Sequence, residues 1–466
     1  MKNKALKKAY VIGSPIAHSL SPAIFSFIAH QEKMSLLYEK CEVKAEELPH
    51  FLMQQKLNQD LIGFNITLPL KELMVAHLQS LSLEASATGA VNVALKVGTN
   101  FEGHNTDVIG IQKSLKNKNF EANGKNCLLW GAGGAAKAMA YVLGLEKAKT
   151  VYVFNRSEKN NPLVTTFNAL FPETEFVAVQ CLELAILPLS LIVNTTPLGM
   201  TGKESGLEYF LQAKQLKFSS GALAYDLIYT PQNTDFLKIA SDLGLKTMGG
   251  LSMFIYQALA TWKIWMGELK EEQRIFIALE NYLNGILSVK NEMKPIFLTG
   301  FMGAGKSSVG KFLAELTNRP FLDTDQIVTE GYGKSIPEIF SSEGEQRFRE
   351  LESMAIRKAL SHNPAVISLG GGALNQIENF TIVRDCGTLI YLAAKPEVLA
   401  FRLKDQVDSR PILQGLTGEA RIQKIESLLK VREPIYQEAE YLIQTDDLSE
   451  KAVAFEILSQ IGEANA

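Results

Sequence analysis

The chain has 466 residues, of which 46% are hydrophobic and 21% are charged, and its formal net charge is -3. This composition predicts an ordinary soluble protein of about three domains, and the nearly balanced charge argues against a nucleic-acid binder that relies on a broad cationic field. The 4 cysteines are scattered without a CxxC pair and the 6 histidines lie apart from them, so no zinc site is expected. The absence of a long apolar run and of a signal-peptide core predicts a cytoplasmic protein without a membrane span.

The first part of the chain alternates strand and helix patterns, beginning with a strand at 8–13 (KAYVIG). Polar clusters interrupt this alternation at 18–22 (HSLSP), 65–71 (NITLPLK), 90–92 (AVN) and 105–107 (NTD). They offer hydroxyls, amides, one lysine and one carboxylate, a set that could hold a polyhydroxy acid and move a proton. Each cluster also has an ordinary explanation, because SLSP can cap a helix, NTD can form a turn and Lys71 can be a solvated charge.

A glycine-rich turn follows the buried strand expected at 126–130 (NCLLW). The run Gly131–Ala136 (GAGGAA) fits G-x-G-x-x-G/A between a strand and a helix, where small residues let the backbone approach a pyrophosphate and the helix N-terminus supplies N–H donors. The next strand ends in Asn155-Arg156-Ser157, without the carboxylate typical of an NAD site. An arginine suits a 2′-phosphate, so this position favours NADP. A plain tight turn and an exposed arginine are the alternatives.

Further strands at 191–196 and 222–229 extend the alternating pattern, which predicts a parallel sheet covered by helices. From about residue 252 the pattern is helical. The polar segment SVKNEMKP that follows ends in a proline, and it is the expected linker.

A second phosphate-binding signature follows the strand expected at 296–300. Residues 300–307 (GFMGAGKS) fit G-x-x-x-x-G-K-[ST], in which backbone N–H groups surround phosphates, Lys306 reaches the β- and γ-phosphates and the Ser307 hydroxyl binds Mg²⁺. Two carboxylates come after the next strand, and arginines and a Gly370–Gly372 run follow. Arginines that converge with glycine backbone suit an anionic acceptor, whereas surface salt bridges and a turn are the ordinary explanations.

Nine motifs between roughly residues 8 and 270 resemble those of shikimate dehydrogenases in identity and order: GSPIAHSLSP, FNITLPLKE, GAVNV, GHNTD, GAGGAA, NRS, NTTPLGM, YDLIY and GGLSMFIYQA. The resemblance implies reduction of 3-dehydroshikimate to shikimate by hydride transfer from NADP(H). Lys71, oriented by Asp107, would polarise the carbonyl oxygen and relay the proton. The implied substrate contacts are Ser19, Ser21, Thr67, Asn92, Asp107, Tyr229 and Gln257. The implied cofactor contacts are Gly131, Ala132, Gly133, Gly134, Ala135, Asn155, Arg156, Ser157, Leu227 and Gly250.

Residues from about 295 to 461 resemble shikimate kinase in their P-loop, FLDTD, RFR, GGG, RP and REPIY segments. The resemblance implies in-line phosphorylation of shikimate by ATP, driven by positioning and charge stabilisation. Asp323 and Ser307 would hold Mg²⁺, and Asp325 would bind the substrate hydroxyls and accept the proton of the attacking 3-OH. The implied acceptor contacts are Asp325, Arg349, Gly371 and Arg432. The implied nucleotide contacts are Gly303, Ala304, Gly305, Lys306, Ser307, Ser308 and the lid residue Arg410.

Together these patterns predict an α/β protein with a substrate domain at 1–107 and a Rossmann NADP-binding domain at 108–287, whose helices from about 252 return to the substrate domain. A linker at 288–294 and a P-loop, NMP-kinase-like three-layer α/β/α domain at 295–466 complete the expected order. The predicted product of the first half is the predicted substrate of the second, as expected for a bifunctional enzyme of the shikimate pathway. The expected partners are small molecules, with no nucleic acid or membrane, and the chain could be a monomer or a homodimer.

Two alternatives stay open at this point. The first is a quinate/shikimate dehydrogenase of broader specificity fused to a gluconate-type kinase, against which the pair Arg349 and Arg432 argues, because it suits a cyclic carboxylate. The second is a regulatory binding protein with one inactive half. The retained proton-transfer and phosphate-binding groups argue against it: Lys71, Asp107, Lys306 and Asp325.

Overall fold

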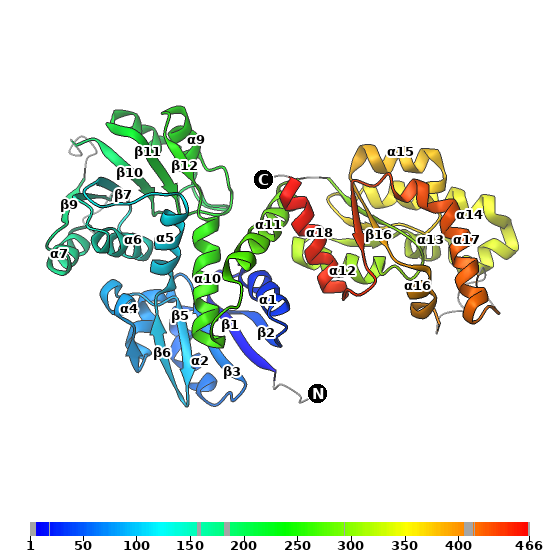
Figure 1. Ribbon diagram of the computed structural model, residues 1–466, viewed down its shortest axis with the longest axis horizontal. Coiled ribbons are helices and arrows are strands. Elements are labelled where there is room, and N and C mark those ends of the chain that lie inside the picture. Colours follow the sequence, from blue (N-terminus) through cyan, green and yellow to red (C-terminus); the bar gives the residue numbers. More distant parts are fainter. Residues whose placement is uncertain are drawn as a thin grey trace. The chain divides into compact units, whose positions relative to one another are not determined.

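The computed structural model describes residues 6–464 except 18, 156–159, 181–186, 293, 405–412 and 414. It divides into two compact units, Met1–Glu280 and Asn281–Ala466 (Figure 1). The predicted α/β class is confirmed, since the described strands form two 6-stranded sheets and one 5-stranded sheet, and helices pack against each sheet. Within the described part of the chain, every helix is too short or too polar to cross a membrane.

The first sheet has the strand order β2-β1-β3-β5-β6-β4. Its strands are β1 (Lys7–Gly13), β2 (Leu36–Glu42), β3 (Leu61–Ile66), β4 (Ser80–Leu81), β5 (Val93–Val97) and β6 (Asn100–His104). The helices of this region are α1 (Ser21–Gln31), α2 (Leu48–Lys56), α3 (Leu70–Leu73) and α4 (Leu83–Thr88). β1, β2 and β3 are parallel, so the loops at their carboxyl ends meet at one edge of the sheet. That edge carries the loop before α1 and the loop between β3 and α3.

The second sheet has the order β12-β11-β10-β7-β8-β9, and all of its strands are parallel. Its strands are β7 (Asn126–Trp130), β8 (Thr150–Phe154), β9 (Glu175–Val179), β10 (Leu189–Asn194), β11 (Phe218–Asp226) and β12 (Lys246–Met248). Its helices are α5 (Thr106–Asn117), α6 (Gly134–Leu145), α7 (Asn160–Leu170), α8 (Leu207–Phe210) and α9 (Asp235–Asp242). This is the strand order of a Rossmann domain, whose crevice lies where the order reverses, between β7 and β10.

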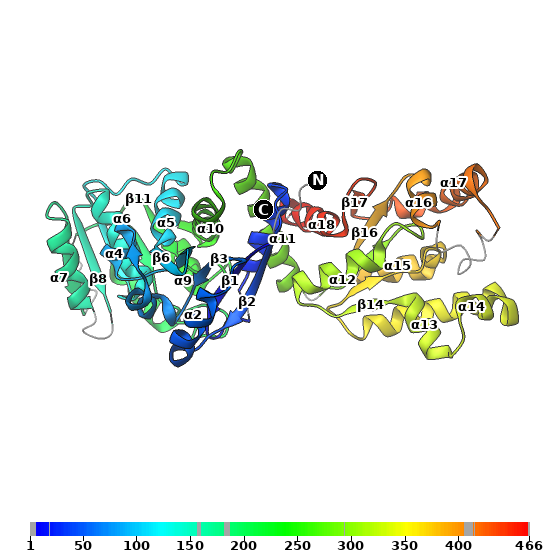
Figure 2. The same ribbon diagram turned by 90° about the horizontal axis from the view of Figure 1, so that it is seen from below.

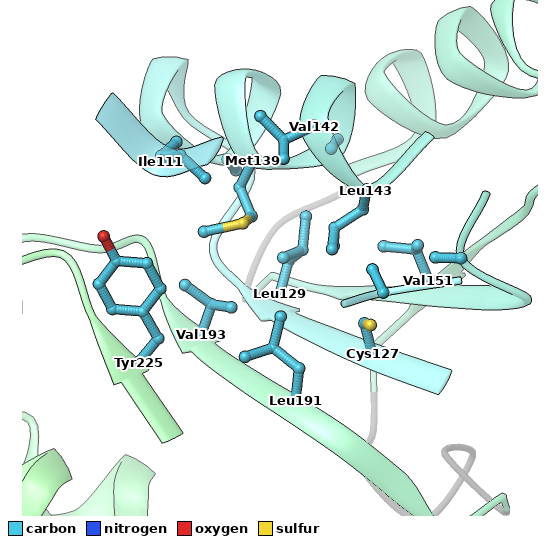
Figure 3. Packing of buried hydrophobic residues seen from close by; sticks show 14 of the residues in the cluster. Ile111, Cys127, Leu129, Met139, Val142, Leu143, Val151, Leu191, Val193 and Tyr225 are labelled. Atoms are coloured by element: carbon cyan, nitrogen blue, oxygen red, sulfur yellow. The ribbon is translucent and has the colours of Figure 1, made fainter. Parts of the chain in front are cut away.

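A buried apolar cluster holds α6 against this sheet (Figure 3). Met139 and Leu143 of α6 lie over Leu129 of β7 and Val193 of β10, and all four side chains are fully buried. Burying a side chain of this size stabilises the fold by roughly 1.5–3 kcal/mol. The cluster therefore fixes the N-terminus of α6 at the carboxyl end of β7.

Helix α10 (Leu251–Met266) connects the two sheets of the first unit, because it runs along α5 and also packs against α1 and β5 (Figure 1). The Trp265 indole N–H donates to the carbonyl of Ala94 at 3.2 Å. The same indole packs against Phe25 and Tyr38, with ring centroids 5.3 Å and 6.2 Å away. Side chains of α10 therefore reach the first sheet.

Helix α11 (Glu272–Asn291) extends into the segment 288–294 that was expected to be a linker. Residues 288–291 are thus helical, and the second compact unit begins earlier, at Asn281. Arg319 accounts for the difference, because its guanidinium donates to the carbonyls of Val289, Glu292 (2.6 Å) and Lys294 (2.6 Å). Val289 lies in the last turn of α11 and the other two residues follow it, so this buried cation stabilises the end of the helix together with the segment after it.

The third sheet is parallel and has the order β14-β15-β13-β16-β17. Its strands are β13 (Ile296–Thr299), β14 (Phe321–Asp323), β15 (Val366–Ser368), β16 (Thr388–Ala393) and β17 (Tyr441–Gln444). The helices are α12 (Lys306–Thr317), α13 (Thr324–Tyr332), α14 (Ile336–Leu360), α15 (Ile377–Cys386), α16 (Pro396–Arg402), α17 (Gly418–Tyr436) and α18 (Glu450–Ala464). They cover both faces of the sheet (Figures 1 and 2).

Candidate active sites

The central polar contact of the first unit joins Lys71 and Asp107. Lys71 lies in the short helix α3 after β3, and its Nζ is 2.6 Å from Oδ2 of Asp107 in the first turn of α5. The other carboxylate oxygen, Oδ1, accepts from Nδ2 of Asn92 at 2.8 Å. Asn105 caps α5 by accepting from the Asp107 backbone N–H at 3.2 Å. Asp107 is thus fixed from three directions, and the lysine ammonium is held in one place.

Further polar side chains extend this contact toward α10. Asn92 accepts from the backbone N–H of Thr106 at 2.7 Å, and the Thr106 hydroxyl lies 3.5 Å from Oε1 of Gln257. Thr106 also lies 3.2 Å from the hydroxyl of Thr261. Thr106 and Thr261 are buried residues that the sequence analysis did not assign to the site. Thr106 could have been predicted from the sequence, because it belongs to the NTD motif and precedes Asp107 directly.

The remaining predicted substrate residues lie on several loops. Ser19 and Ser21 precede and begin α1, and their hydroxyls are 3.2 Å apart. Thr67 follows β3 and packs closely against Gly13. A Cβ added to Gly13 would lie only 2.5 Å from the methyl group of Thr67. Tyr229 stacks on Phe254 with centroids 4.1 Å apart, and it lines a cavity of about 210 Å³ together with Gly250. The structure thus brings Lys71, Asp107, Asn92 and Gln257 into one connected set of contacts.

The glycine-rich turn of the first unit lies at the crevice between β7 and β10. Gly131 has φ of +118°, and a Cβ there would lie 2.7 Å from the Thr195 hydroxyl. Gly133 and Gly134 face open space, and no described side chain caps the N-terminus of α6. Such an N-terminus is suited to a phosphate, because its N–H groups lack partners within the helix. The turn therefore fits the pyrophosphate of a dinucleotide.

Two other predicted cofactor residues lie across this crevice. Gly250 approaches Leu227 so closely that a Cβ on it would lie 2.2 Å from the Leu227 carbonyl oxygen. Asn155 lies directly after β8 and is half-buried. Arg156 and Ser157, which carry the prediction of NADP preference, lie outside the described residues, as does the predicted lid residue Arg410.

The P-loop of the second unit connects β13 to α12. Gly300, Gly303 and Gly305 have φ values of +139°, +81° and +95°, which favour glycine. Lys306 donates to the carbonyls of Gly300 at 2.8 Å and Phe301 at 3.1 Å, so its ammonium lies over the loop. The Ser307 hydroxyl donates to Oδ2 of Asp323 at 2.7 Å. One hydroxyl and one carboxylate beside a phosphate-binding loop fit Mg²⁺, which takes few protein ligands at such sites.

The predicted acceptor residues surround the glycines after β15. The guanidinium of Arg349 lies against Gly372, where an added Cβ would be 2.6 Å from Nη1. The guanidinium of Arg432 lies against Gly371, where an added Cβ would be 3.4 Å from Nη1. On Gly370, a Cβ would lie 2.7 Å from an Asp325 oxygen. Two guanidinium groups and one carboxylate therefore converge on this backbone, and a side chain at Gly370 or Gly372 would displace Asp325 or Arg349.

Glu352 and Tyr436 complete this arrangement, although neither was predicted to be a site residue. Glu352 accepts from Nη1 of Arg349 at 2.8 Å, and its side chain is 2% exposed. Burial raises the pKa of Glu352, while the charge of Arg349 opposes this shift. The Tyr436 hydroxyl donates to the carbonyl of Gly371. The spacing of three residues between Arg349 and Glu352 on one helix was the sequence signal for their contact.

Comparison with known proteins shows which families the two halves of the chain resemble. Residues 11–94 match the family model of the shikimate dehydrogenase substrate binding domain, and residues 302–462 match that of shikimate kinase. A shikimate dehydrogenase (NADP(+)) of Carboxydothermus hydrogenoformans is 34% identical over 268 residues, which cover 57% of this chain and 93% of the relative. A shikimate kinase of Chlorobaculum parvum is 43% identical over 156 residues, which cover 32% of this chain and 83% of the relative. The chain belongs to both families.

The fold of the dehydrogenase half is also that of its family. The crystal structure of shikimate dehydrogenase from Aquifex aeolicus matches with a TM-score of 0.52 and 31% identity, covering 59% of this chain and 99% of that one. The predicted fusion of a shikimate dehydrogenase with a shikimate kinase is therefore confirmed, as is the combination of an oxidoreductase with a phosphotransferase.

Proposed function

We propose that this chain reduces 3-dehydroshikimate to shikimate with NADPH and then phosphorylates shikimate with ATP to shikimate 3-phosphate. The observation that carries the proposal is the presence, in one chain, of the Lys71–Asp107 pair with a dinucleotide-type turn and of a P-loop with a two-arginine acceptor site. The product of the first reaction is the acceptor of the second. Two unrelated sites would have no reason to match in this way.

In the dehydrogenase half, NADPH supplies the hydride when it is bound in the crevice between β7 and β10. The Lys71 ammonium, held by Asp107, donates a hydrogen bond to the substrate carbonyl oxygen and passes a proton to that oxygen as negative charge develops on it. Ser19, Ser21, Thr67, Asn92, Tyr229 and Gln257 bind the carboxylate and hydroxyls. Arg156 gives the preference for NADPH by pairing with the 2′-phosphate.

In the kinase half, ATP supplies the phosphoryl group, and Mg²⁺ neutralises charge on its phosphates when Ser307 and Asp323 hold it. Lys306 contacts the β- and γ-phosphates, and Arg410 is proposed as a further nucleotide contact on the basis of the sequence motif alone. Asp325 accepts the proton of the attacking hydroxyl, while Arg349 and Arg432 orient the acceptor through its carboxylate. Most of the rate enhancement then comes from positioning and charge stabilisation.

We also propose functional domains at 1–107, 108–287 and 295–466. The compact units divide at a different place, since residues 281–291 of α11 belong to the second compact unit, which contains the kinase domain.

The experiment assays each half separately on the purified full-length chain. NADPH oxidation should require 3-dehydroshikimate, and ADP formation should require shikimate and Mg²⁺. In the wild type, KM for NADH should be higher than KM for NADPH, and Arg156→Gln should remove this preference. A chain that binds these ligands without turnover in either half would contradict the proposal.

A further inference from the structure

Asp226 is a completely buried carboxylate that the mechanism above does not use. It is the last residue of β11, and it accepts three hydrogen bonds. The donors are Nδ2 of Asn194 at 3.0 Å, the backbone N–H of Ile228 at 3.0 Å and the hydroxyl of Thr234 at 2.6 Å. Burial raises the pKa of Asp226 to about 6, and the three hydrogen bonds oppose this shift. Among the described residues, no cation accompanies this carboxylate.

The three donors belong to segments that surround the carboxyl edge of the second sheet. Asn194 ends β10 and shapes the following turn, since it accepts from the Thr196 backbone N–H at 3.1 Å and donates to the Leu198 carbonyl at 3.2 Å. Thr234 caps α9 by accepting from the Leu237 backbone N–H at 3.3 Å. One carboxylate thus ties together the β10–α8 turn, the segment after β11 and the start of α9.

The segment after β11 also holds the residues assigned to the cofactor and the substrate. The Leu227 backbone N–H donates to the carbonyl of Asn194 at 3.2 Å, and the Gly250 N–H donates to that of Ile228 at 3.0 Å. Leu227 and Gly250 are the predicted cofactor contacts on this side of the crevice, and Tyr229 is a predicted substrate contact. Their backbone positions therefore depend on where Asp226 holds Asn194 and Ile228.

We infer that Asp226 is a positioning residue for the cofactor pocket of the dehydrogenase half. Its carboxylate fixes the backbone of residues 227–229 against the turn at 194–198. The predicted cofactor contacts Leu227 and Gly250 are thereby held in the positions that bind the cofactor. This inference rests on the proposed dehydrogenase function. A buried carboxylate without a cationic partner is costly to retain. Its capacity to accept hydrogen bonds from three segments at once offsets that cost, because the Ile228 N–H and the Thr234 hydroxyl would otherwise lose their acceptor in a buried site.

The hydrogen-bonding role separates two substitutions of the same residue. Asp226→Ala removes the acceptor for all three donors. Asp226→Asn keeps one oxygen for the N–H groups of Asn194 and Ile228, and the Thr234 hydroxyl can rotate to accept from the new amide nitrogen. Thr234→Val preserves shape but removes one donor to Asp226 and, with it, the acceptor that caps α9. Asp235→Ala is the matched control, because Asp235 is the neighbouring acid and pairs with Lys238 at 3.3 Å on the surface.

The test measures KM and kcat for NADPH, together with the Kd for NADPH by fluorescence titration, in the full-length chain. Kinase turnover of the same preparation normalises the concentration. We expect Asp226→Ala to raise KM and Kd for NADPH at least about 10-fold and Thr234→Val to raise them about 3-fold. Asp226→Asn should return both to within about 3-fold of wild type, and Asp235→Ala should leave them unchanged.

A purely structural role would lower the amount of active dehydrogenase, and so the apparent kcat, without changing KM or Kd. That result for Asp226→Ala and Thr234→Val would overturn the inference. An Asp226→Asn protein as impaired in KM as Asp226→Ala would overturn it too, because charge rather than hydrogen bonding would then matter. A wild-type chain without NADPH oxidation would instead contradict the proposed function, and the Kd comparison would still decide the role of Asp226.

Discussion

The Nζ of Lys71 lies 2.6 Å from Oδ2 of Asp107, although the two residues belong to different helices and are 36 positions apart. The Asn92 amide occupies the other oxygen of Asp107 at 2.8 Å, so the carboxylate cannot turn away from the lysine without losing a buried hydrogen bond. The pair is therefore set before substrate binds, as a proton-transfer group requires.

Replacing Lys71 tests this arrangement most simply. We expect Lys71→Ala to lower kcat for NADPH-dependent reduction by about 10²–10⁴-fold, because it removes the general acid. Lys113→Met is the matched control, since Lys113 also pairs with a carboxylate, Glu272, but is not one of the predicted site residues. Its kcat should stay within about twofold of wild type, because this partly exposed ion pair has no role in the proposed proton transfer. Equal losses in both variants would contradict the assignment.

Glu352 should govern acceptor binding in the kinase half through Arg349. Glu352→Gln removes the buried negative charge beside the guanidinium, so that Glu345, at 3.0 Å, is the remaining carboxylate paired with Arg349 among the described residues. We expect KM for shikimate to rise at least about 10-fold while KM for ATP changes little. Glu350→Gln removes a similar contact with Arg347 on the surface and should leave both values unchanged. Unchanged KM for shikimate in Glu352→Gln would rule out this role.

Arg319 should stabilise the kinase unit by capping α11. Arg319→Met leaves the carbonyls of Val289, Glu292 and Lys294 without this donor, and we expect a loss of about 2–4 kcal/mol in the unfolding free energy of that unit. Lys311→Met, on the exposed face of α12, should cost almost nothing. The 3 tryptophans, Trp130, Trp262 and Trp265, all lie in the first unit, so their fluorescence reports that unit alone, whereas circular dichroism reports both. An unchanged kinase transition would argue against the cap.

The stability of the dehydrogenase unit should depend on pH through Asp226. Its pKa of about 6 lies above the ordinary 3.8, so the folded state binds the proton more tightly than the unfolded state does. The contribution of Asp226 is therefore fully present below about pH 4 and is lost as the pH rises through 6. The titratable group beside it is Tyr225, whose pKa burial raises further above its usual range, so it does not titrate in this window.

Asp226→Asn removes this titration and provides the reference. The unfolding free energy of wild type minus that of the variant should fall by about 2 kcal/mol between pH 4.5 and pH 7.5. Tryptophan fluorescence during urea unfolding measures the difference. A difference that is constant across this range would show that the carboxyl group does not titrate there.

Motifs made the central groups predictable from the sequence, because each lies beside a turn that its neighbours specify. The P-loop places Lys306 and Ser307 at a helix start, and the NTD segment places Asp107 in the first turn of α5. Glu352 was missed because a glutamate within a charged helix gives no local sign of burial. It is buried only because α14 packs beside the glycines after β15.

The expected linker shows a second limit of sequence patterns. Residues 288–294 are polar, as loops usually are, yet α11 continues to Asn291. Its carbonyls meet Arg319, and its backbone at Gly285 meets α18 so closely that a Cβ there would lie 1.7 Å from the Leu458 carbonyl oxygen. These contacts join positions far apart in the chain, and no local pattern contains them.

If one chain carries out two consecutive reactions, a single purified protein must show both of them. The most direct measurement supplies purified wild-type protein with 3-dehydroshikimate, NADPH and Mg-ATP, and follows NADPH absorbance and shikimate 3-phosphate together. We expect NADPH oxidation followed by equivalent formation of shikimate 3-phosphate, with shikimate accumulating instead when ATP is left out. Oxidation without phosphorylation in the presence of ATP, or no oxidation while NADPH still binds, would contradict the proposed function.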